Sequence, residues 1–434
     1  MAELATTFEQ PFKPASLPAR QVVAVVVGNA LEFYDFLTYA FFATQIGRTF
    51  FPSANAEHSL LASLATFGAG FVTRPIGAVV IGSIGDRVGR KPAMLLSFSM
   101  MGIAIIGLAL TPSYRVIGMA APILVICFRL LQGFALGGEV GPTTAFMIEA
   151  APPERRGFYG SLQYATQDVA VLCAGGVGTI LASLLSAQQL DDWGWRIAVL
   201  IGACIVPFGL YIRRGLDETL KARAADETDV APARIRPHLR VAVLGLLMLL
   251  AGTVSTYVLN YMTTYASATL HMKANAAFGA TLVIGLVEVC FDMTSGWLSD
   301  KVGRKSMMIT FFLLLLGSVL PAFALISRLR TPEALLGASA LLAMLLGLGT
   351  TPVLIAITES IPRQIRSGMV ATIYALSISV FGGSTQFMIT WLIHVTGSPL
   401  APAWYMAGAI AIGLVAMGLI QESAPVKKKP KAAA

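Results

Sequence analysis

Charged side chains are scarce in this sequence of 434 residues: 31 Lys and Arg and 23 Asp and Glu amount to 12% of the chain, whereas soluble domains carry about 25%. Hydrophobic residues make up 56% and gather in long runs. Met307 to Leu325 contains no charge, and Leu239 to Leu270 contains only Arg240. Crossing a bilayer takes about 20 apolar residues. The sequence therefore excludes a soluble enzyme and predicts an all-α membrane protein.

Cysteine and histidine are also rare, with four of each. The cysteines fall inside apolar runs without metal-ligand spacing, so we expect small core residues at Cys127, Cys173, Cys204 and Cys290. The apolar runs hold no His-rich or Cys-rich group that could form a metal site or a nucleophile–base pair. We expect no metal, no cofactor and no enzymatic activity.

The net charge of +8 arises from basic residues in short loops between apolar runs. Nucleic-acid binding would need a basic face in polar surroundings, so no nucleic-acid partner is expected. Most Lys and Arg fall on one side if both termini are cytoplasmic, as the positive-inside rule requires. The outer loops then hold only Arg48, Arg115, Lys273, Arg328 and Arg330.

Twelve apolar stretches are long enough to span a bilayer. They are 21–46, 58–84, 92–112, 117–146, 157–187, 194–214, 239–269, 274–299, 306–328, 332–359, 367–396 and 401–421. The first is too long for the apolar region of a cleavable signal peptide, so none is expected.

One long polar segment, 215–238, divides the spans into two sets of six. The predicted organisation is a cytoplasmic tail, an N-terminal six-helix bundle, a cytoplasmic linker, a C-terminal six-helix bundle and a second cytoplasmic tail. Their bounds are 1–20, 21–214, 215–238, 239–421 and 422–434.

An internal repeat supports two related halves. The segment 82–91, GSIGDRVGRK, matches 296–305, GWLSDKVGRK, and the same offset holds at every matched position. A second pair of similar segments is 149–157 and 359–368. Parallel six-span repeats are typical of major-facilitator-type carriers.

The repeated G-x-x-x-D-[RK]-x-G-R-K motif resembles the signature of the major facilitator superfamily. Further motifs resemble its metabolite:proton symporter family across nearly the whole chain, nearest the citrate and tricarballylate branch. They are Gly28-Asn29-Ala-Leu-Glu32-Phe-Tyr34-Asp35-Phe36, Arg74-Pro75-Ile-Gly77, Arg129-Leu-Leu-Gln132-Gly133, Gly137-Gly138-Glu139, Trp193-Gly-Trp195-Arg196 and the segment 213–219. The resemblance implies twelve helices in two pseudo-symmetric bundles and import of small organic acids, shikimate or betaines.

Charges inside spans cost roughly 2.5–3.5 kcal/mol each at mid-depth, so each needs a reason. Glu32 and Asp35 share one face of the first span. Neighbouring buried carboxyl groups hold protons more tightly than isolated ones. We expect a proton-coupling site there, with Asp35 paired to Arg129. The alternative is a fixed ion pair that only joins two helices.

Arg74 lies twelve residues before Asp86, about 18 Å along a helix. The repeat places Glu288 at the equivalent position of the second half, so the two should lie at matching depth. The arginine fork binds carboxylates in a bidentate way that lysine cannot. Arg74 and Arg129 are therefore candidate substrate anchors, and structural ion pairs are the alternative.

Further polar residues fall on helical faces within the spans. Candidate proton-coupling residues are Glu139, Glu288 and Asp292, although the two last could instead hold a cation or neutralise Arg74. Asp168 has no assigned role. Candidate substrate ligands besides the arginines are Asn29, Gln132, Gln163, Gln167, Tyr257, Asn260, Tyr261 and Gln386. Interhelical hydrogen bonding or an interfacial aromatic belt would also explain such residues.

The repeated motif suggests an inner gate on the cytoplasmic side. Its aspartates can meet helix ends and arginines of neighbouring spans, in a network that breaks when the halves rock. The alternative is that the basic loops only mark topology. The gate candidates are Asp86, Arg90, Glu149, Arg156, Asp300, Arg304, Glu359 and Arg366.

These observations favour a proton-coupled symporter of a small di- or tricarboxylate, working by alternating access in the inner membrane. A zwitterionic osmolyte, or a shikimate-like or 2-oxoglutarate-like substrate, is the alternative. Two related halves around buried charges favour a carrier over a channel. The sequence does not distinguish proton from sodium coupling. We expect each chain to hold a complete pathway within the lipid bilayer and to work as a monomer.

Overall fold

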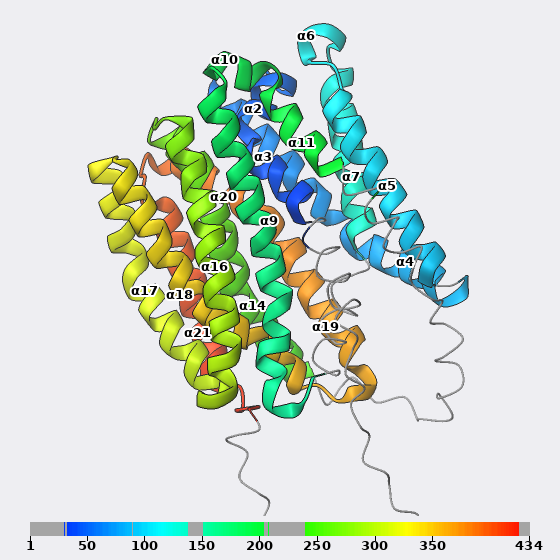
Figure 1. Cartoon of the computed structure of the whole chain (residues 1–434), viewed down its shortest axis with the longest axis vertical. Helices are drawn as coiled ribbons and strands as arrows, with labels where there is room; N and C mark the ends of the chain where they lie inside the picture. Colours follow the sequence, from blue (N-terminus) through cyan, green and yellow to red (C-terminus); the bar gives the residue numbers. More distant parts are fainter. Residues whose placement is uncertain are drawn as a thin grey trace, which may run out of the picture.

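The computed structural model describes residues 33–88, 90–137, 151–203 and 239–424, together with Ala30 and Pro207, and these residues are almost entirely helical. Figure 1 shows the helices packed as a bundle of roughly parallel rods. The linker and nearly all of the two tails lie outside the described residues, so the domain boundaries stay predictions.

The first half begins with a helical stretch at 33–41, and helices joined by short turns follow it. They are α2 (Ala43–Phe50), α3 (Ala56–Val72), α4 (Arg74–Arg87), α5 (Arg90–Leu110), α6 (Tyr114–Ile117), α7 (Ala120–Leu136), η1 (Pro153–Arg155), α9 (Arg156–Leu184), α10 (Ala187–Gln189), η2 (Leu190–Gly194) and α11 (Trp195–Ala203).

The second half is described throughout and contains the longer helices. They are α14 (Leu239–Asn260), α15 (Met262–Thr264), η4 (Tyr265–Thr269), α16 (Ala274–Val302), α17 (Arg304–Leu329), α18 (Pro332–Glu359), α19 (Arg363–Ser377), η5 (Ile378–Gly382), α20 (Gly383–Thr396) and α21 (Ala401–Leu419).

Eight described helical stretches are long and apolar enough to cross a membrane, and Leu95–Leu110 and Ala120–Leu136 are shorter apolar helices. The predicted span 332–359 coincides with α18, whose start has two sequence causes. Pro332 occupies the first turn, where its missing N–H costs nothing, and the Oγ1 atom of Thr331 accepts a hydrogen bond from the Ala334 amide at 3.3 Å.

The predicted span 58–84 forms two consecutive helices, α3 and α4, with the break at Thr73. Pro75 follows in the first turn of α4, and because proline lacks an N–H it cannot continue the hydrogen-bond ladder of α3. Thr73 Oγ1 donates to the carbonyl of Leu130 at 2.7 Å, which ties the break to α7. Arg74 is thus the first residue of a helix, α4.

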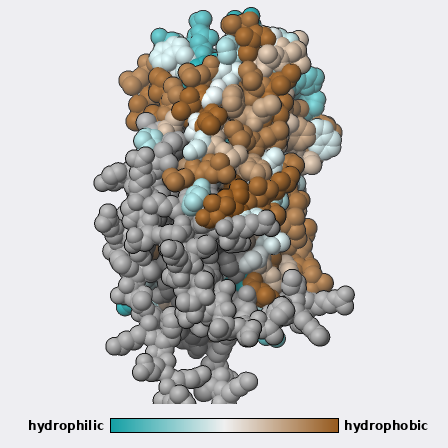
Figure 2. Space-filling view, turned by 90° about the vertical axis from the view of Figure 1, so that its right-hand side faces the viewer, coloured by the Kyte–Doolittle hydropathy of each residue, from teal (hydrophilic) through white to brown (hydrophobic). Residues whose placement is uncertain are grey.

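Large apolar side chains cover the outside of the bundle. Leu313, Leu314, Trp404 and Ile412 are exposed on α17 and α21, and Figure 2 shows apolar side chains over most of the coloured part of one face. Exposing so many apolar side chains to water is unfavourable, whereas lipid hydrocarbon solvates them.

The prediction of core cysteines is wrong for Cys127, Cys173 and Cys290, which are exposed. An apolar run in a membrane protein faces lipid as readily as the interior, which explains the error. Cys204 lies outside the described residues.

The two halves touch along α9 and α16, which lie side by side in Figure 1, and along α3 and α20. Small residues permit this approach, as is usual between membrane helices. A Cβ atom at Gly285 would lie 2.4 Å from the backbone nitrogen of Leu172, and one at Gly68 would lie 2.5 Å from the carbonyl oxygen of Gly383. Larger residues at these points would force the halves apart.

Two adjacent glycines of α9 provide a matched test of this contact. A Cβ at Gly175 would lie 2.5 Å from the Leu282 backbone nitrogen, whereas at Gly176 the nearest atom would be Leu282 Cδ1 at 3.6 Å. Gly175→Ala should lower the thermal unfolding temperature in detergent, since overpacking costs about 1–3 kcal/mol. Gly176→Ala should leave that temperature unchanged or raise it slightly, because alanine favours helix. Equal effects of the two changes would contradict the backbone contact.

Candidate functional site: a carboxyl-lined cavity between the two halves

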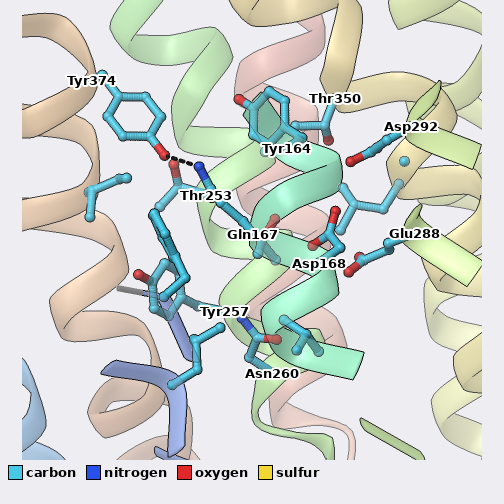
Figure 3. A pocket seen from close by; sticks show the side chains of 18 residues that line it. Tyr164, Gln167, Asp168, Thr253, Tyr257, Asn260, Glu288, Asp292, Thr350 and Tyr374 are labelled. Atoms are coloured by element: carbon cyan, nitrogen blue, oxygen red, sulfur yellow. Dashed lines mark hydrogen bonds between the residues drawn. The ribbon is translucent and has the colours of Figure 1, made fainter. Parts of the chain in front are cut away.

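A cavity lies between α9 of the first half and α14, α16, α18 and α19 of the second. Its described lining includes three carboxylic acids, three tyrosines, three threonines and two amides, and no Lys, Arg or His. Figure 3 shows this lining from close by. A polar, titratable cavity inside an apolar exterior is the arrangement expected of a solute site.

Three buried acids, here called the carboxyl cluster, occupy one wall of this central cavity: Asp168 on α9, and Glu288 and Asp292 on α16. The Asp168 carboxyl group interacts with those of both Glu288 and Asp292, and Figure 3 shows it lying between them. Thr351 Oγ1 of α18 donates to Asp292 Oδ1 at 3.0 Å. The cluster therefore joins the two halves through side chains.

Aromatic and amide groups form much of the remaining lining of the cavity. Gln167 Nε2 donates to the hydroxyl of Tyr374 at 3.3 Å, which links α9 to α19. Tyr164, Gln167 and Asp168 share one face of α9, at the i, i+3 and i+4 spacing that aligns side chains on a helix. The face of α9 that carries the acid also carries the hydrogen-bond donors.

A second buried polar chain lies within the first half. Gln132 Nε2 donates to Asp35 Oδ2, and Arg129 Nη1 donates to Gln132 Oε1. Asp35 and Arg129 are 3% and 1% exposed. The predicted pair is thus connected through Gln132, and the Nε and Nη2 atoms of Arg129 have no hydrogen-bond partner among the described residues.

Aromatic rings surround both deep arginines. The Arg129 guanidinium carbon lies 4.7 and 4.5 Å from the ring centroids of Phe36 and Tyr39, and that of Arg74 lies 4.3 and 4.4 Å from those of Phe36 and Phe71. Such cation–π contacts offset part of the cost of a buried cation. The Phe71 ring in turn lies 5.8 Å from that of Tyr257, a cavity residue. Arg74 is therefore one aromatic layer from the cavity.

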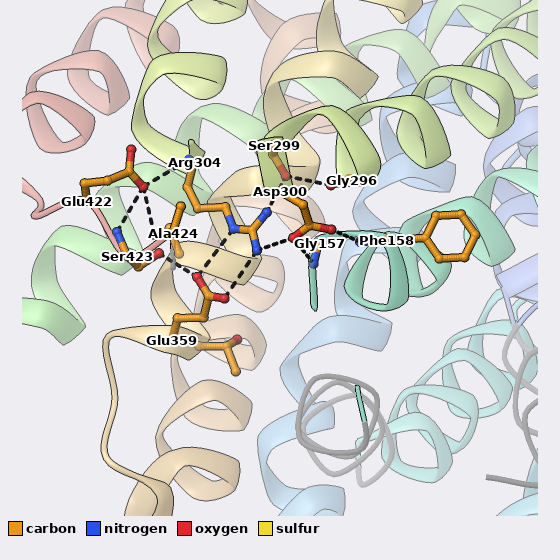
Figure 4. Close-up of polar contacts among 12 residues, drawn as sticks. Gly157, Phe158, Gly296, Ser299, Asp300, Arg304, Glu359, Glu422, Ser423 and Ala424 are labelled. Carbon is orange, nitrogen blue, oxygen red and sulfur yellow. Dashed lines mark hydrogen bonds and ion pairs between the residues drawn. The ribbon is translucent and has the colours of Figure 1, made fainter. Parts of the chain in front are cut away.

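A buried ion cluster around Arg304 joins the halves at the end of the bundle where α9 begins and α16 ends (Figure 4). The Arg304 side chain is fully buried, and its Nη2 atom lies 2.7 Å from Asp300 Oδ1 and 3.3 Å from Glu359 Oε1. Asp300 accepts hydrogen bonds from the backbone N–H groups of Gly157 and Phe158 at 2.8 and 3.1 Å. A carboxylate of the second half thus caps the N-terminus of α9, where the helix dipole favours negative charge.

The segment after the last helix contributes to this Arg304 cluster. Glu422 accepts hydrogen bonds from the backbone amides of Arg304 and Lys305 at 3.0 and 3.1 Å. Ser423 Oγ donates to Glu359 Oε2 at 2.7 Å. The start of α17 is therefore capped by residues that follow α21.

The comparisons with known proteins agree with this architecture. The chain is 35% identical over 399 residues to the citrate-proton symporter of Klebsiella pneumoniae, covering 91% of this chain and 90% of that protein. It belongs to the metabolite:proton symporter family of the major facilitator superfamily. The sugar (and other) transporter family matches residues 21–221.

Other members and structures place the chain in the same fold. It is 30% identical over 431 residues to the glycine betaine/proline/ectoine/pipecolic acid transporter of Dickeya dadantii, covering 95% of this chain and 86% of that protein. The crystal structure of a D-xylose-proton symporter superposes with a TM-score of 0.74 at 17% identity, covering 94% of this chain and 99% of that one. The protein is thus a major facilitator transporter.

The structure brings some predicted site residues of this symporter family member to the central cavity and places others elsewhere. Gln167, Tyr257, Asn260, Glu288 and Asp292 line it. The Tyr261 hydroxyl instead accepts a hydrogen bond from Thr390 at 2.8 Å, on α20. The remaining described candidates are buried outside the cavity lining, namely Asp35, Arg74, Arg129, Gln132, Gln163 and Gln386.

The inner-gate candidates divide in the same way. Asp300, Arg304 and Glu359 form the Arg304 cluster, whereas Arg366 Nε donates to the Ile361 carbonyl at 3.1 Å. Arg156 begins α9 beside that cluster. Asn29, Glu32, Glu139 and Glu149, and the side chains of Asp86 and Arg90, lie outside the described residues.

Sequence reasoning gave no role to Asp168 and did not select Tyr164, Thr350 or Tyr374. All four line the cavity. The signal for Tyr164 and Asp168 was the spacing 164, 167, 168 and 171 on one helical face, which already contained Gln167. Thr350 and Tyr374 fall in apolar helices without a polar pattern, and only the helix crossings bring them together.

Two buried glutamines allow a matched test of the Asp35–Gln132–Arg129 chain. Gln132→Leu leaves two buried charged groups short of a partner, at a cost of about 1–3 kcal/mol for each unsatisfied group. Gln386 is equally buried, but neither of its amide atoms has a partner among the described residues. In detergent without substrate, Gln132→Leu should lower the unfolding temperature and Gln386→Leu should leave it unchanged or raise it. The reverse order would refute the bridging role of Gln132.

Proposed function

We propose that this protein is a proton-coupled symporter that carries a small organic acid, a di- or tricarboxylate such as citrate or tricarballylate, into the cytoplasm. The observation that carries the proposal is the central cavity, which is lined by titratable groups and lies between helices of both halves. A site at that position can face either side of the membrane in turn when the halves rock about it. The similarity to a citrate-proton symporter supports the coupling ion and substrate class.

Three charged residues of the first half have roles in this proposal. Asp35 takes up the coupling proton, because a buried carboxyl joined to Arg129 only through an amide can change partner when it is protonated. Arg74 and Arg129 attract the substrate carboxylates. Arg129 retains unpartnered donor atoms among the described residues, and Arg74 lies beside Phe71, which contacts Tyr257 at the cavity.

The Arg304 cluster closes the cytoplasmic side in this scheme. It joins α9 of the first half to α16 and α18 of the second through buried charge-assisted hydrogen bonds, which are stronger than neutral ones. Opening toward the cytoplasm would break the Asp300 contact with the start of α9. The protein then lies in the inner membrane with both termini in the cytoplasm.

The cavity chemistry also favours a second candidate, symport of a zwitterionic osmolyte. Three carboxylic acids and three tyrosines line the cavity without a basic residue among the described lining. Acids and aromatic faces bind cationic groups such as a quaternary ammonium. A betaine would satisfy both the acids and the nearby arginines.

Uptake by cells that lack their own carriers distinguishes these candidates. The cells would receive labelled citrate, tricarballylate, 2-oxoglutarate, shikimate or glycine betaine, with and without a protonophore. We expect uptake of an organic acid above the external concentration, its loss with the protonophore, and no change when potassium replaces sodium. Betaine uptake without organic-acid uptake would overturn the leading candidate in favour of the second.

The same assay tests the arginine anchor. Arg74→Lys removes the bidentate fork and its stacking, so the KM for the organic acid should rise by about tenfold or more. Arg115→Lys makes the same change at an exposed position of α6 and should leave KM unaltered. Equal KM values for the two variants would show that Arg74 has only a structural role.

A further inference from the structure

The carboxyl cluster contains more acid than one proton site needs. Its three residues come from both halves, and Asp168, Glu288 and Asp292 are 8%, 4% and 3% exposed. Asp35 lies apart from the cluster and bonds to Gln132 instead. Among the described residues, Asp35 and the carboxyl cluster are thus separate buried acid sites, one within the first half and one between the halves.

Close helix packing determines the geometry of the cluster. A Cβ at Gly285 would lie 3.0 Å from the Asp168 carbonyl oxygen, so glycine brings α9 against α16 at this level. Glu288 follows Gly285 by three residues and Asp292 by seven, which places all three on one helical face. A Cβ at Gly347 of α18 would lie 3.0 Å from Asp292 Oδ1, so that glycine makes room for the carboxyl group.

The contacts between these acids imply bound protons. Three carboxyl groups buried this close together repel one another when they are ionised, so the cluster is more stable when it holds protons. The other titratable groups facing the cluster are the hydroxyls of Tyr164 on α9, Tyr257 on α14 and Tyr374 on α19. These groups are neutral donors. No basic side chain among the described lining residues compensates the acids.

An unpartnered polar side chain at the same cavity points to a ligand. Thr350 Oγ1 is buried without a hydrogen-bond partner among the described residues. Asn260, which is 3% exposed, adds an amide to the same lining. Both residues line the cavity with the carboxyl cluster, and Figure 3 labels them together. Because buried polar groups normally have hydrogen-bond partners, the Thr350 hydroxyl indicates that a ligand in the cavity supplies its partner.

We propose that the carboxyl cluster is a second proton-binding site that binds the substrate directly, with protonated Asp168, Glu288 and Asp292 donating hydrogen bonds to a substrate carboxylate. The inference rests on the proposed function and adds a substrate contact and a stoichiometry to it. Protons enter with the substrate from outside and leave with it inside, so each cycle carries at least one proton on this cluster besides that on Asp35.

The same scheme explains why acids line a site for an anion. When the cluster loses its protons on the cytoplasmic side, it repels the substrate carboxylate and releases it. Loading with protons outside converts the same groups into donors. Thr350 and Asn260 supply further donors that do not depend on pH.

Proton uptake on binding tests this proposal. Purified protein in weak buffer at pH 8 would receive citrate at the same pH, and a pH-sensitive dye would report the protons taken up per citrate bound. Asp168→Asn keeps a donor amide but removes one titrating group, so uptake should fall by about one proton per citrate. Citrate exchange across liposomes should persist, while accumulation driven by the proton gradient should fall below that of wild type, because fewer protons accompany each citrate.

Matched variants keep the result decisive. Glu333→Gln removes an acid from the exposed start of α18. This variant should take up as many protons per citrate bound as the wild-type protein. Glu288→Gln replaces Asp168→Asn if the latter fails to fold. If a folded variant of the cluster takes up as many protons per citrate as wild type and accumulates citrate equally well, the proposal is overturned. If wild-type protein itself neither binds nor accumulates citrate, the proposed substrate fails instead, and the other labelled solutes replace citrate in the same test.

Discussion

The backbone contact between α9 and α16 is the constraint on which the other features depend. Glycines at 175 and 285 let these helices, one from each half, touch along their length. That contact places Asp168 against Glu288 and Asp292, and it brings the start of α9 onto Asp300. The cavity and the Arg304 cluster are thus two levels of one helix pair, so a change at either level is transmitted along rigid rods to the other.

The two halves carry residues of different chemistry at equivalent positions of the internal repeat. At equivalent positions the first half carries Arg74, stacked between Phe36 and Phe71, and the second half carries Glu288, in contact with Asp168. At this pair of equivalent positions the first half therefore supplies a cation with aromatic neighbours, and the second half supplies an acid. This asymmetry accounts for the replacement of an arginine by a glutamate and suits a carrier that moves an anion together with protons.

The sequence predicted the all-helical fold and the long spans because these follow from local pattern and length. The repeated motif also predicted that Asp300 would meet arginines and helix ends. The sequence also placed Glu288 and Asp292 on one face of a helix. It could not place Asp168 against them, because that contact depends on how two helices more than a hundred residues apart cross each other. For the same reason it joined Asp35 directly to Arg129, whereas the amide of Gln132 lies between them.

The proposed transport cycle requires that the start of α9 and the end of α16 separate during transport. Spin labels at Arg155 and Val302, both exposed beside the Arg304 cluster, would measure this distance in protein whose four cysteines have been replaced. We predict a short distance without substrate and a second, longer population when a transported substrate and protons are added. A single distance that stays the same under all conditions, in labelled protein that still transports, would contradict the account.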